Sequence, residues 1–120
     1  MRQLPEFRMD AQEVAVIEPC TQEAGAFMVD FNLFQFLEKK GNTGMSKIDF
    51  KILNEHVRSI SNVASQVQMS ERLGICKIMC PKWEVIIARS GRIVVRRARS
   101  REIINLAVNF IFKLLDNCLI

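Results

Sequence analysis

The sequence predicts a single α+β domain, in which a small antiparallel sheet carries a long central helix and a C-terminal helix packed on one face. Two β-branched runs on either side of Ser90-Gly91 indicate a β-hairpin, and two segments with helical spacing of apolar residues indicate the helices. At 120 residues and 49% hydrophobic content, the chain is long enough for one hydrophobic core. The expected order along residues 1–120 is an N-terminal strand and short helix (1–45), a long helix (46–73), strands with a basic hairpin (74–99) and a C-terminal helix (100–118).

The N-terminal part predicts one strand and one short helix. Residues 14–17 are a short apolar run that Glu18-Pro19 stops, which is typical of a strand. Asp30 precedes an apolar segment that ends in two lysines and Gly41, so Asp30 is the expected N-cap of a helix. Four phenylalanines fall within ten residues of this region, which indicates either core packing or a surface for a partner or for nucleic-acid bases.

A long central helix is predicted over residues 46–73. Apolar residues recur at alternating four- and three-residue spacing, at Leu53, Val57, Ile60, Ala64 and Val67. Ser46 is the expected N-cap, and Gly74 is the expected stop. An unbroken helix of this length would measure ~40 Å, which exceeds a compact domain of this size, so the helix either breaks near residues 59–65 or projects.

The predicted hairpin consists of the runs WEVIIAR and RIVVRRA, joined by Ser90-Gly91. With a two-residue turn, Ile87 lies opposite Val94 and Glu84 lies opposite Arg97, so that one opposite-charge pair helps to fix the register. Both faces of the hairpin are apolar in the middle. We therefore expect neighbouring strands and helices to cover it further.

The C-terminal helix is predicted to begin after Ser100 as N-cap, with Glu102 in its first turn. One apolar stripe of this helix consists of Ile104, Val108, Ile111, Leu115 and Cys118. A second apolar stripe lies beside the first, so the helix must be largely buried, either against the sheet or against another subunit. A homo-oligomer formed through this helix is therefore one expectation.

Positive charge is concentrated in the C-terminal part of the chain. The formal net charge is +4, but residues 1–73 have a balance of −2 and residues 74–120 a balance of +6. The predicted partner-binding residues are the hairpin arginines Arg89, Arg92, Arg96, Arg97, Arg99 and Arg101. Such a surface favours an acidic partner. The alternative is a solvated hairpin whose arginines deter edge-to-edge pairing.

The motif Cys76-x3-Cys80-Pro81 gives the cysteines three interpretations. Together with Cys20 and Cys118 they supply four thiolates, enough for one iron–sulfur cluster or a structural zinc, and a Cys-Pro step is similar to the last ligand of ferredoxin-type runs. Alternatively they are redox-responsive thiols, favoured by neighbouring lysines, or the buried face of an ordinary strand. In an extended strand the Cα atoms of Cys76 and Cys80 would stand ~13 Å apart, too far for a shared metal. A turn between the two cysteines would instead bring them within reach of one metal.

Other motifs point to no enzymatic chemistry. The sequence contains no P-loop, G-x-G-x-x-G fingerprint or nucleophile elbow, so we expect a non-catalytic protein. No apolar run approaches the ~18 residues that a membrane-spanning helix needs, and the N-terminus has no secretory apolar region. These features predict a cytoplasmic protein that does not itself span a membrane.

Residues 81–115 resemble one half of the TATA-box-binding protein family. The order is Pro81, an apolar strand, Ser90-Gly91, the strand RIVV, the step Ala98-Arg99-Ser100 and a helix, with Arg97 where the family has glycine. The resemblance implies a saddle-like α+β unit with helices on one face of an antiparallel sheet. The chain also resembles small basic cytosolic proteins of methanogenic archaea, some of which serve anaerobic enzyme complexes.

The sequence therefore predicts a regulatory or accessory protein. It is expected to dock on an acidic surface of a larger, anaerobic enzyme complex through the arginine-rich hairpin. Its cysteines are expected to sense redox state or to hold an iron–sulfur cluster. The alternative is a nucleic-acid-binding module that uses the same arginines on phosphates.

Overall fold

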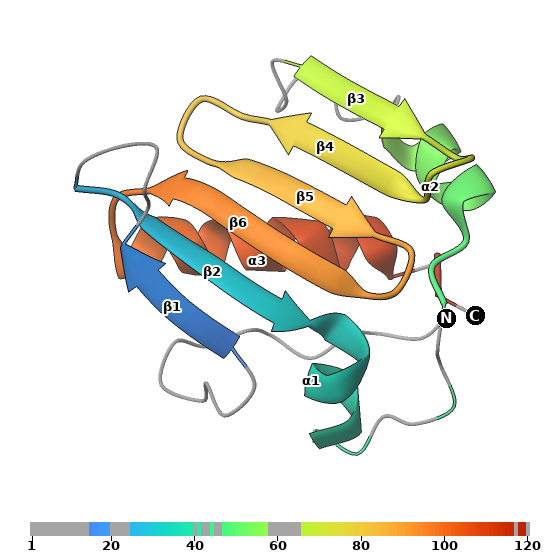
Figure 1. The fold of residues 1–120 in the computed structure, drawn as a ribbon, viewed down its shortest axis with the longest axis horizontal. Helices are drawn as coiled ribbons and strands as arrows, with labels where there is room; N and C mark the ends of the chain where they lie inside the picture. Colours follow the sequence, from blue (N-terminus) through green and yellow to red (C-terminus); the bar gives the residue numbers. More distant parts are fainter. Residues whose placement is uncertain are drawn as a thin grey trace.

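The computed structural model describes residues 15–19 (backbone only), 25–39, 41, 44, 47–57, 66–116 and 118–119. It confirms the α+β class: six strands form one antiparallel sheet in the order β1-β2-β6-β5-β4-β3 (Figure 1). The strands are β1 (Ala15–Pro19), β2 (Phe27–Asn32), β3 (Gln66–Ser70), β4 (Ile75–Met79), β5 (Glu84–Ala88) and β6 (Arg92–Ala98). The helices are α1 (Leu33–Lys39), α2 (Phe50–Val57) and α3 (Arg101–Leu115).

The core lies between the sheet and α3, which runs across one face of the sheet (Figure 1). The Oγ of Ser100 accepts a hydrogen bond from the backbone N–H of Ile103 at 3.2 Å, which confirms the predicted N-cap. The predicted apolar stripe of α3 is buried throughout, against buried sheet residues that include Val85, Ile87, Ile93 and Val95. The helix ends at Leu115, and Cys118 lies beyond it in the core.

The hairpin forms as predicted, but its register differs by one residue. Ile87 pairs with Ile93, and Glu84 pairs with Arg96, because three residues rather than two connect the strands. The backbone N–H of Gly91 donates to the carbonyl of Ala88 at 2.9 Å, and Gly91 has a φ of +95°. This is the three-residue loop in which a glycine in the left-handed region follows a tight turn.

The long helix predicted over residues 46–73 is wrong in its second half, because Gln66–Ser70 is the edge strand β3. Val67 and Met69 are half-buried, while Gln66 and Gln68 are exposed, which is the period of two expected for a strand covered on one face. Val67 fits both the helical spacing and the alternation of a strand, so its position alone does not distinguish the two structures. The described helix α2 ends at Val57, and residues 58–65 lie outside the described chain.

The N-caps of α1 and α2 also differ from the predicted residues. Asp30 lies within β2, and the Oδ1 of Asn32 instead accepts hydrogen bonds from the backbone N–H groups of Phe34 and Gln35. At α2, the carboxylate of Asp49 caps the helix in the same way, whereas Ser46 lies outside the described residues. Both caps place a side-chain oxygen on orphan N–H groups of the first turn.

Strand β6 contains a bulge beside β2. Val95 and Ala98 are three residues apart, so a regular strand would place them on opposite faces, yet both are fully buried. The register shifts between Phe27 and Val29 of β2, and Arg97 has a φ of +69°. The extra residue restores Ala98 to the core and leaves Arg96 and Arg97 as the two residues between the buried positions.

This bulge predicts an inverted ranking of substitutions at Arg97. In a regular strand valine is more stable than glycine, but the left-handed region disfavours a β-branched residue and suits glycine. We expect Arg97→Gly to be more stable than Arg97→Val by about 1–2 kcal/mol in urea unfolding. The same pair of substitutions at Gln68, in regular β3, should give the opposite order. Greater stability of Arg97→Val would contradict the bulge.

Candidate functional site

The face of the sheet opposite α3 carries none of the described helices (Figure 1). We call this side of β2, β6, β5 and β4 the open face. Its side chains alternate along each strand with the buried ones, and the register places them in rows across the sheet. They include Met28, Asp30, Ile75, Lys77, Glu84, Ile86, Ala88, Arg92, Val94 and Arg96.

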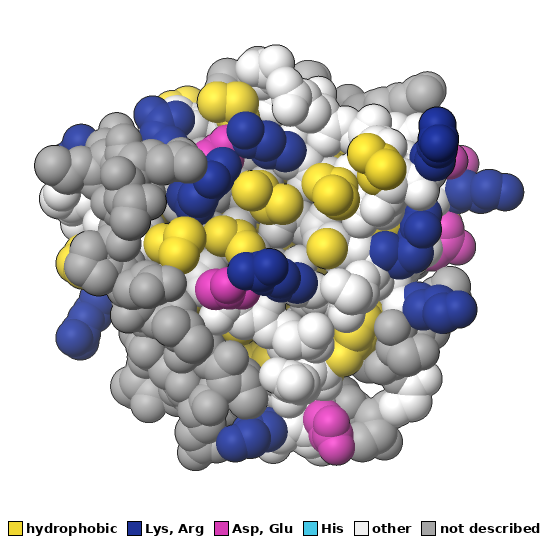
Figure 2. Space-filling view, in the orientation of Figure 1, with side chains coloured by type: hydrophobic (Ala, Val, Ile, Leu, Met, Phe, Trp, Pro, Cys, Tyr) yellow, Lys and Arg dark blue, Asp and Glu magenta, His cyan; other side chains and the backbone are white. Residues whose placement is uncertain are grey.

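An apolar stripe crosses the open face obliquely. We define it as Met28, Val94, Ile86, Ala88 and Ile75. Ile86 lies directly opposite Val94, and Ala88 lies directly opposite Ile75. Ile75 is 43% exposed and the others are half-buried. Figure 2 shows hydrophobic side chains running obliquely between two groups of charged residues.

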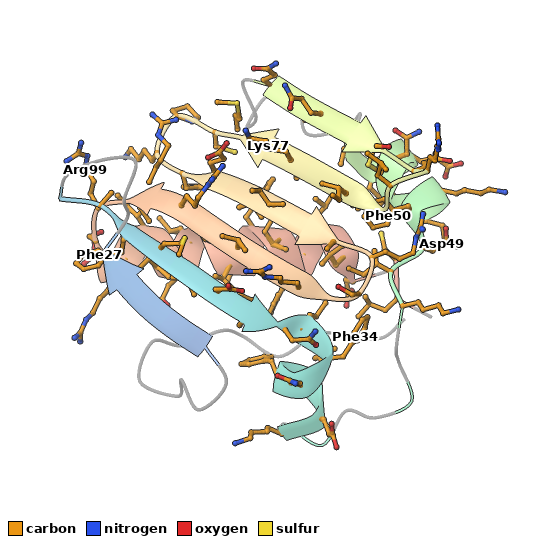
Figure 3. The ribbon with its side chains drawn as sticks, in the orientation of Figure 1. Phe27, Phe34, Asp49, Phe50, Lys77 and Arg99 are labelled. Atoms are coloured by element: carbon orange, nitrogen blue, oxygen red, sulfur yellow. The ribbon has the colours of Figure 1, made fainter. Side chains whose placement is uncertain are left out.

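On one side of the stripe, Glu84 holds two cations in place. Its Oε1 lies 2.9 Å from the Nζ of Lys77, and its Oε2 lies 2.8 Å from the Nη2 of Arg96 (Lys77 is labelled in Figure 3). Glu84 is only 3% exposed and is the one buried charged residue in the described part of the chain. Burial raises its pKa, but the hydrogen bonds and charges of Lys77 and Arg96 outweigh burial, so the pKa lies below its usual value.

On the other side of the stripe, Arg92 and Asp30 form a two-pronged ion pair. The Nε of Arg92 donates to Oδ1 of Asp30 at 3.1 Å, and its Nη2 donates to Oδ2 at 2.7 Å. Among the described residues of the open face, three cations thus contact two carboxylates through these ion pairs. The stripe therefore has a cationic residue on each border.

The six predicted arginines do not share one surface. Arg92 and Arg96 lie on the open face, and Arg97 follows in the bulge. Arg89 lies in the β5–β6 turn, where its guanidinium stands 5.4 Å from the ring centre of Phe50 and donates to the carbonyl of Glu71. Arg99 and Arg101 are exposed and follow β6 in the chain, and Arg99 lies at the end of that strand remote from the turn (Figure 3).

Sequence reasoning missed three members of this site: Lys77, Glu84 as a buried ion-pair partner, and Asp30. A signal for the first two was present, since a three-residue loop ending in Gly91 pairs Glu84 with Arg96 instead of Arg97. The pairing of β4 with β5 then sets Met79 opposite Glu84 and Lys77 one position away on the same face. Asp30 gave no such signal, because its pattern fits a helix N-cap equally well.

The described cysteines are separate and buried. Cys76, Ile78 and Cys80 are almost fully buried, which confirms the interpretation as the covered face of a strand. Because β4 is extended, the Cα atoms of Cys76 and Cys80 are ~13 Å apart. Within the described ranges no three His, Cys, Asp or Glu side chains are grouped as metal ligands, and Cys20 lies outside those ranges.

Burial also makes these thiols poor nucleophiles. It raises the pKa of Cys76 to about 11, and it raises the pKa of Cys80. At Cys118, burial and the charge of Asp49 raise the pKa to about 11, and the thiol donates to the carbonyl of Leu114 at 3.4 Å. The thiolate is the reactive form of cysteine, so the raised pKa values lower the reactive fraction of these three thiols.

We therefore predict slow labelling of Cys76 and Cys118 in the folded protein. A pKa raised by two units reduces the thiolate fraction near pH 8 by about a hundredfold, and burial reduces access further. Iodoacetamide labelling followed by peptide mass spectrometry, with and without urea, measures each site. Labelling of either cysteine at the same rate in both conditions would contradict the buried placement.

The described aromatic residues other than Phe27 belong to the core or pack against it, whereas Phe27 at the start of β2 is 39% exposed. The rings of Phe31, Phe36 and Phe112 pack together in the core with centre-to-centre distances of 5.3–6.3 Å. Trp83 is half-buried against Phe110 of α3, 6.2 Å between ring centres. The three rings in the core are therefore unavailable as a platform on which bases could stack.

Comparisons with known proteins add no assignment: no family model, no curated protein and no solved structure matches this chain. None of the described helices has the length and apolar character required to cross a membrane.

Proposed function

We propose that this protein is a non-catalytic accessory or regulatory protein that docks on an acidic surface of a larger enzyme complex through its open face. The observation that carries the proposal is the apolar stripe opposite α3, bordered on both sides by cations. An antiparallel sheet with one covered face ordinarily presents polar side chains on the other. Apolar side chains rimmed by charges are instead typical of protein interaction sites.

The charges give this face its preference for an acidic partner. Complementary charge raises association rates and fixes the orientation of two proteins, while the buried apolar area supplies most of the affinity. Of the six arginines predicted to bind a partner, the proposal thus retains Arg92 and Arg96, and it adds Lys77. The buried cysteines take no part in it. An iron–sulfur cluster that includes Cys20 stays a prediction, which iron and sulfide analysis after anaerobic purification tests.

The docking proposal is tested with two anionic probes, poly-L-glutamate and a short DNA duplex. We expect saturable binding of poly-L-glutamate that Arg92→Ala weakens about three- to tenfold, since an exposed charge contact contributes ~1 kcal/mol. Arg101→Ala is the matched control, because it removes an arginine exposed on α3. Tighter binding of DNA with a steep loss in salt would favour the nucleic-acid alternative instead. Equal effects of the two substitutions would contradict the assignment of the open face.

A further inference from the structure

We infer that the partner presents an amphipathic α-helix with acidic residues along both borders of its apolar side, and that this helix packs along the apolar stripe. The inference rests on the proposed function and specifies the element that docks. A sheet with apolar side chains on both faces is stable when a layer of secondary structure covers each face. α3 supplies one layer, and the partner helix supplies the other.

The dimensions of the stripe fit a helix. From Met28 on β2 to Ile75 on β4 it crosses three strand spacings and two rows, which corresponds to ~20 Å at ~4.8 Å per strand and ~3.3 Å per residue. A helix of about 13 residues has this length at ~1.5 Å per residue. Its positions i, i+3, i+4 and i+7 would contact the stripe.

The backbone of the open face excludes a docked strand as the binding mode. Strands β2, β6, β5 and β4 each have a neighbour on both sides, so their N–H and C=O groups are already paired in the sheet. An extended peptide gains affinity mainly from backbone hydrogen bonds at a sheet edge. On this face only side chains are available, and a helix presents side chains on a continuous surface while its own backbone is satisfied.

The exposed members of the ion pairs indicate which charge the partner helix should carry. The side chain of Arg92 is 64% exposed against 28% for Asp30, and that of Lys77 is 33% exposed against 4% for Glu84. The carboxylates thus lie beneath the cations and hold them in place. A docking element therefore meets positive charge on both borders of the stripe, which favours glutamate or aspartate on both borders of the helix.

Three synthetic peptides of equal length test the inference. The first has leucines at the helical contact positions and glutamates on both borders, the second is a scrambled version without an apolar side, and the third has lysines in place of the glutamates. Fluorescence anisotropy measures affinity, and methyl NMR of Ile86 and Val94 reports the binding site. We expect the first peptide to bind at least tenfold more tightly than the other two and to shift both methyl signals.

Substitutions on the stripe provide the second arm. Val94→Thr keeps the β-branched shape and, combined with Ile86→Thr, should weaken the first peptide at least fivefold while near-UV circular dichroism stays unchanged. Leu106→Ser removes an apolar side chain that is 60% exposed on α3 and should leave the affinity unchanged. If the double variant loses its fold, the wild-type protein still tests the inference, through the methyl shifts of Ile86 and Val94 and the comparison of the amphipathic peptide with the scrambled one.

The outcomes separate this inference from the proposed function. Equal binding of the amphipathic and scrambled peptides, lost in Arg92→Ala, would overturn the helix and leave acidic docking intact. Methyl shifts confined to α3 would overturn the inference as well. If neither acidic peptide nor poly-L-glutamate binds, the proposed function fails together with the inference. Self-association through this face, detected by sedimentation of the protein alone, would replace the partner helix with a second copy.

Discussion

Replacing Glu84 with glutamine is expected to lower the free energy of unfolding at pH 7 by about 2–3 kcal/mol. The carboxylate is buried and contacts both Lys77 and Arg96, so the substitution leaves two cations without their counter-charge. Breaking a fully buried pair costs more than this, but both cations retain some contact with water. Urea unfolding followed by circular dichroism measures the loss.

The same contribution should disappear in acid. The pKa of Glu84 is lower in the folded protein than its ordinary value of 4.5. Its stabilisation is therefore fully present above about pH 4.5 and is lost as the pH falls through the folded pKa. The difference in stability between the wild type and Glu84→Gln should be large at pH 7 and should shrink below pH 4.

Glu55→Gln is the control for this prediction, since Glu55 is exposed on α2. A surface substitution of this kind is expected to change the free energy of unfolding by no more than about 0.5 kcal/mol at either pH. Equal effects of the two substitutions at pH 7 would show that the buried cluster does not stabilise the fold.

Replacing Gly91 with alanine is expected to destabilise the protein by about 3 kcal/mol. A Cβ at this position would stand 2.4 Å from Cδ2 and 2.6 Å from Cε2 of Phe34, which lies against the turn (Figure 3). The φ of +95° adds the strain of a left-handed conformation, about 1–2 kcal/mol for an alanine, and displacement of the ring adds the rest. Thermal and urea unfolding measure the change.

Gly41→Ala separates these two causes. Gly41 has a similar φ of +82°, but no atom lies within 4 Å of the position its Cβ would take. Its substitution should therefore cause only the conformational loss, about 1–2 kcal/mol. In addition, the double variant Phe34→Ala with Gly91→Ala should lose less than the sum of its single variants, because the clash is absent. Strict additivity would argue against contact between Phe34 and Gly91.

Features that depend on a few neighbouring residues could be predicted from the sequence, whereas features that depend on strand pairing could not. The C-terminal helix and its cap at Ser100 followed from a pattern within a few residues, and the structure confirms both. The burial of Cys76 and Cys80 followed from strand alternation. In β3, by contrast, burial next to β4 makes a strand of residues whose spacing also fits a helix.

The open face was only partly predictable for the same reason. The high number of arginines in the hairpin was evident from the sequence. The face of the sheet on which each arginine lies, however, depends on a one-residue difference in loop length and on the bulge at Arg97. Both features reassign side chains between faces. Asp30 reaches Arg92 only because β2 pairs with β6, and no local pattern connects these two strands.

The strand order also has a consequence for how the chain folds as it is synthesised. Strands β3, β4, β5 and β6 pair as consecutive neighbours, so each can join the previous one as soon as it is made. Strand β2 pairs with β6, with Val29 opposite Val95, although nearly the whole of the remaining sheet is encoded between them. During translation β1 and β2 emerge first and can pair with each other, but β2 lacks its second neighbour until β6 has left the ribosome. Completion of the sheet is therefore expected to be a late event, set by the slow closure of this long loop.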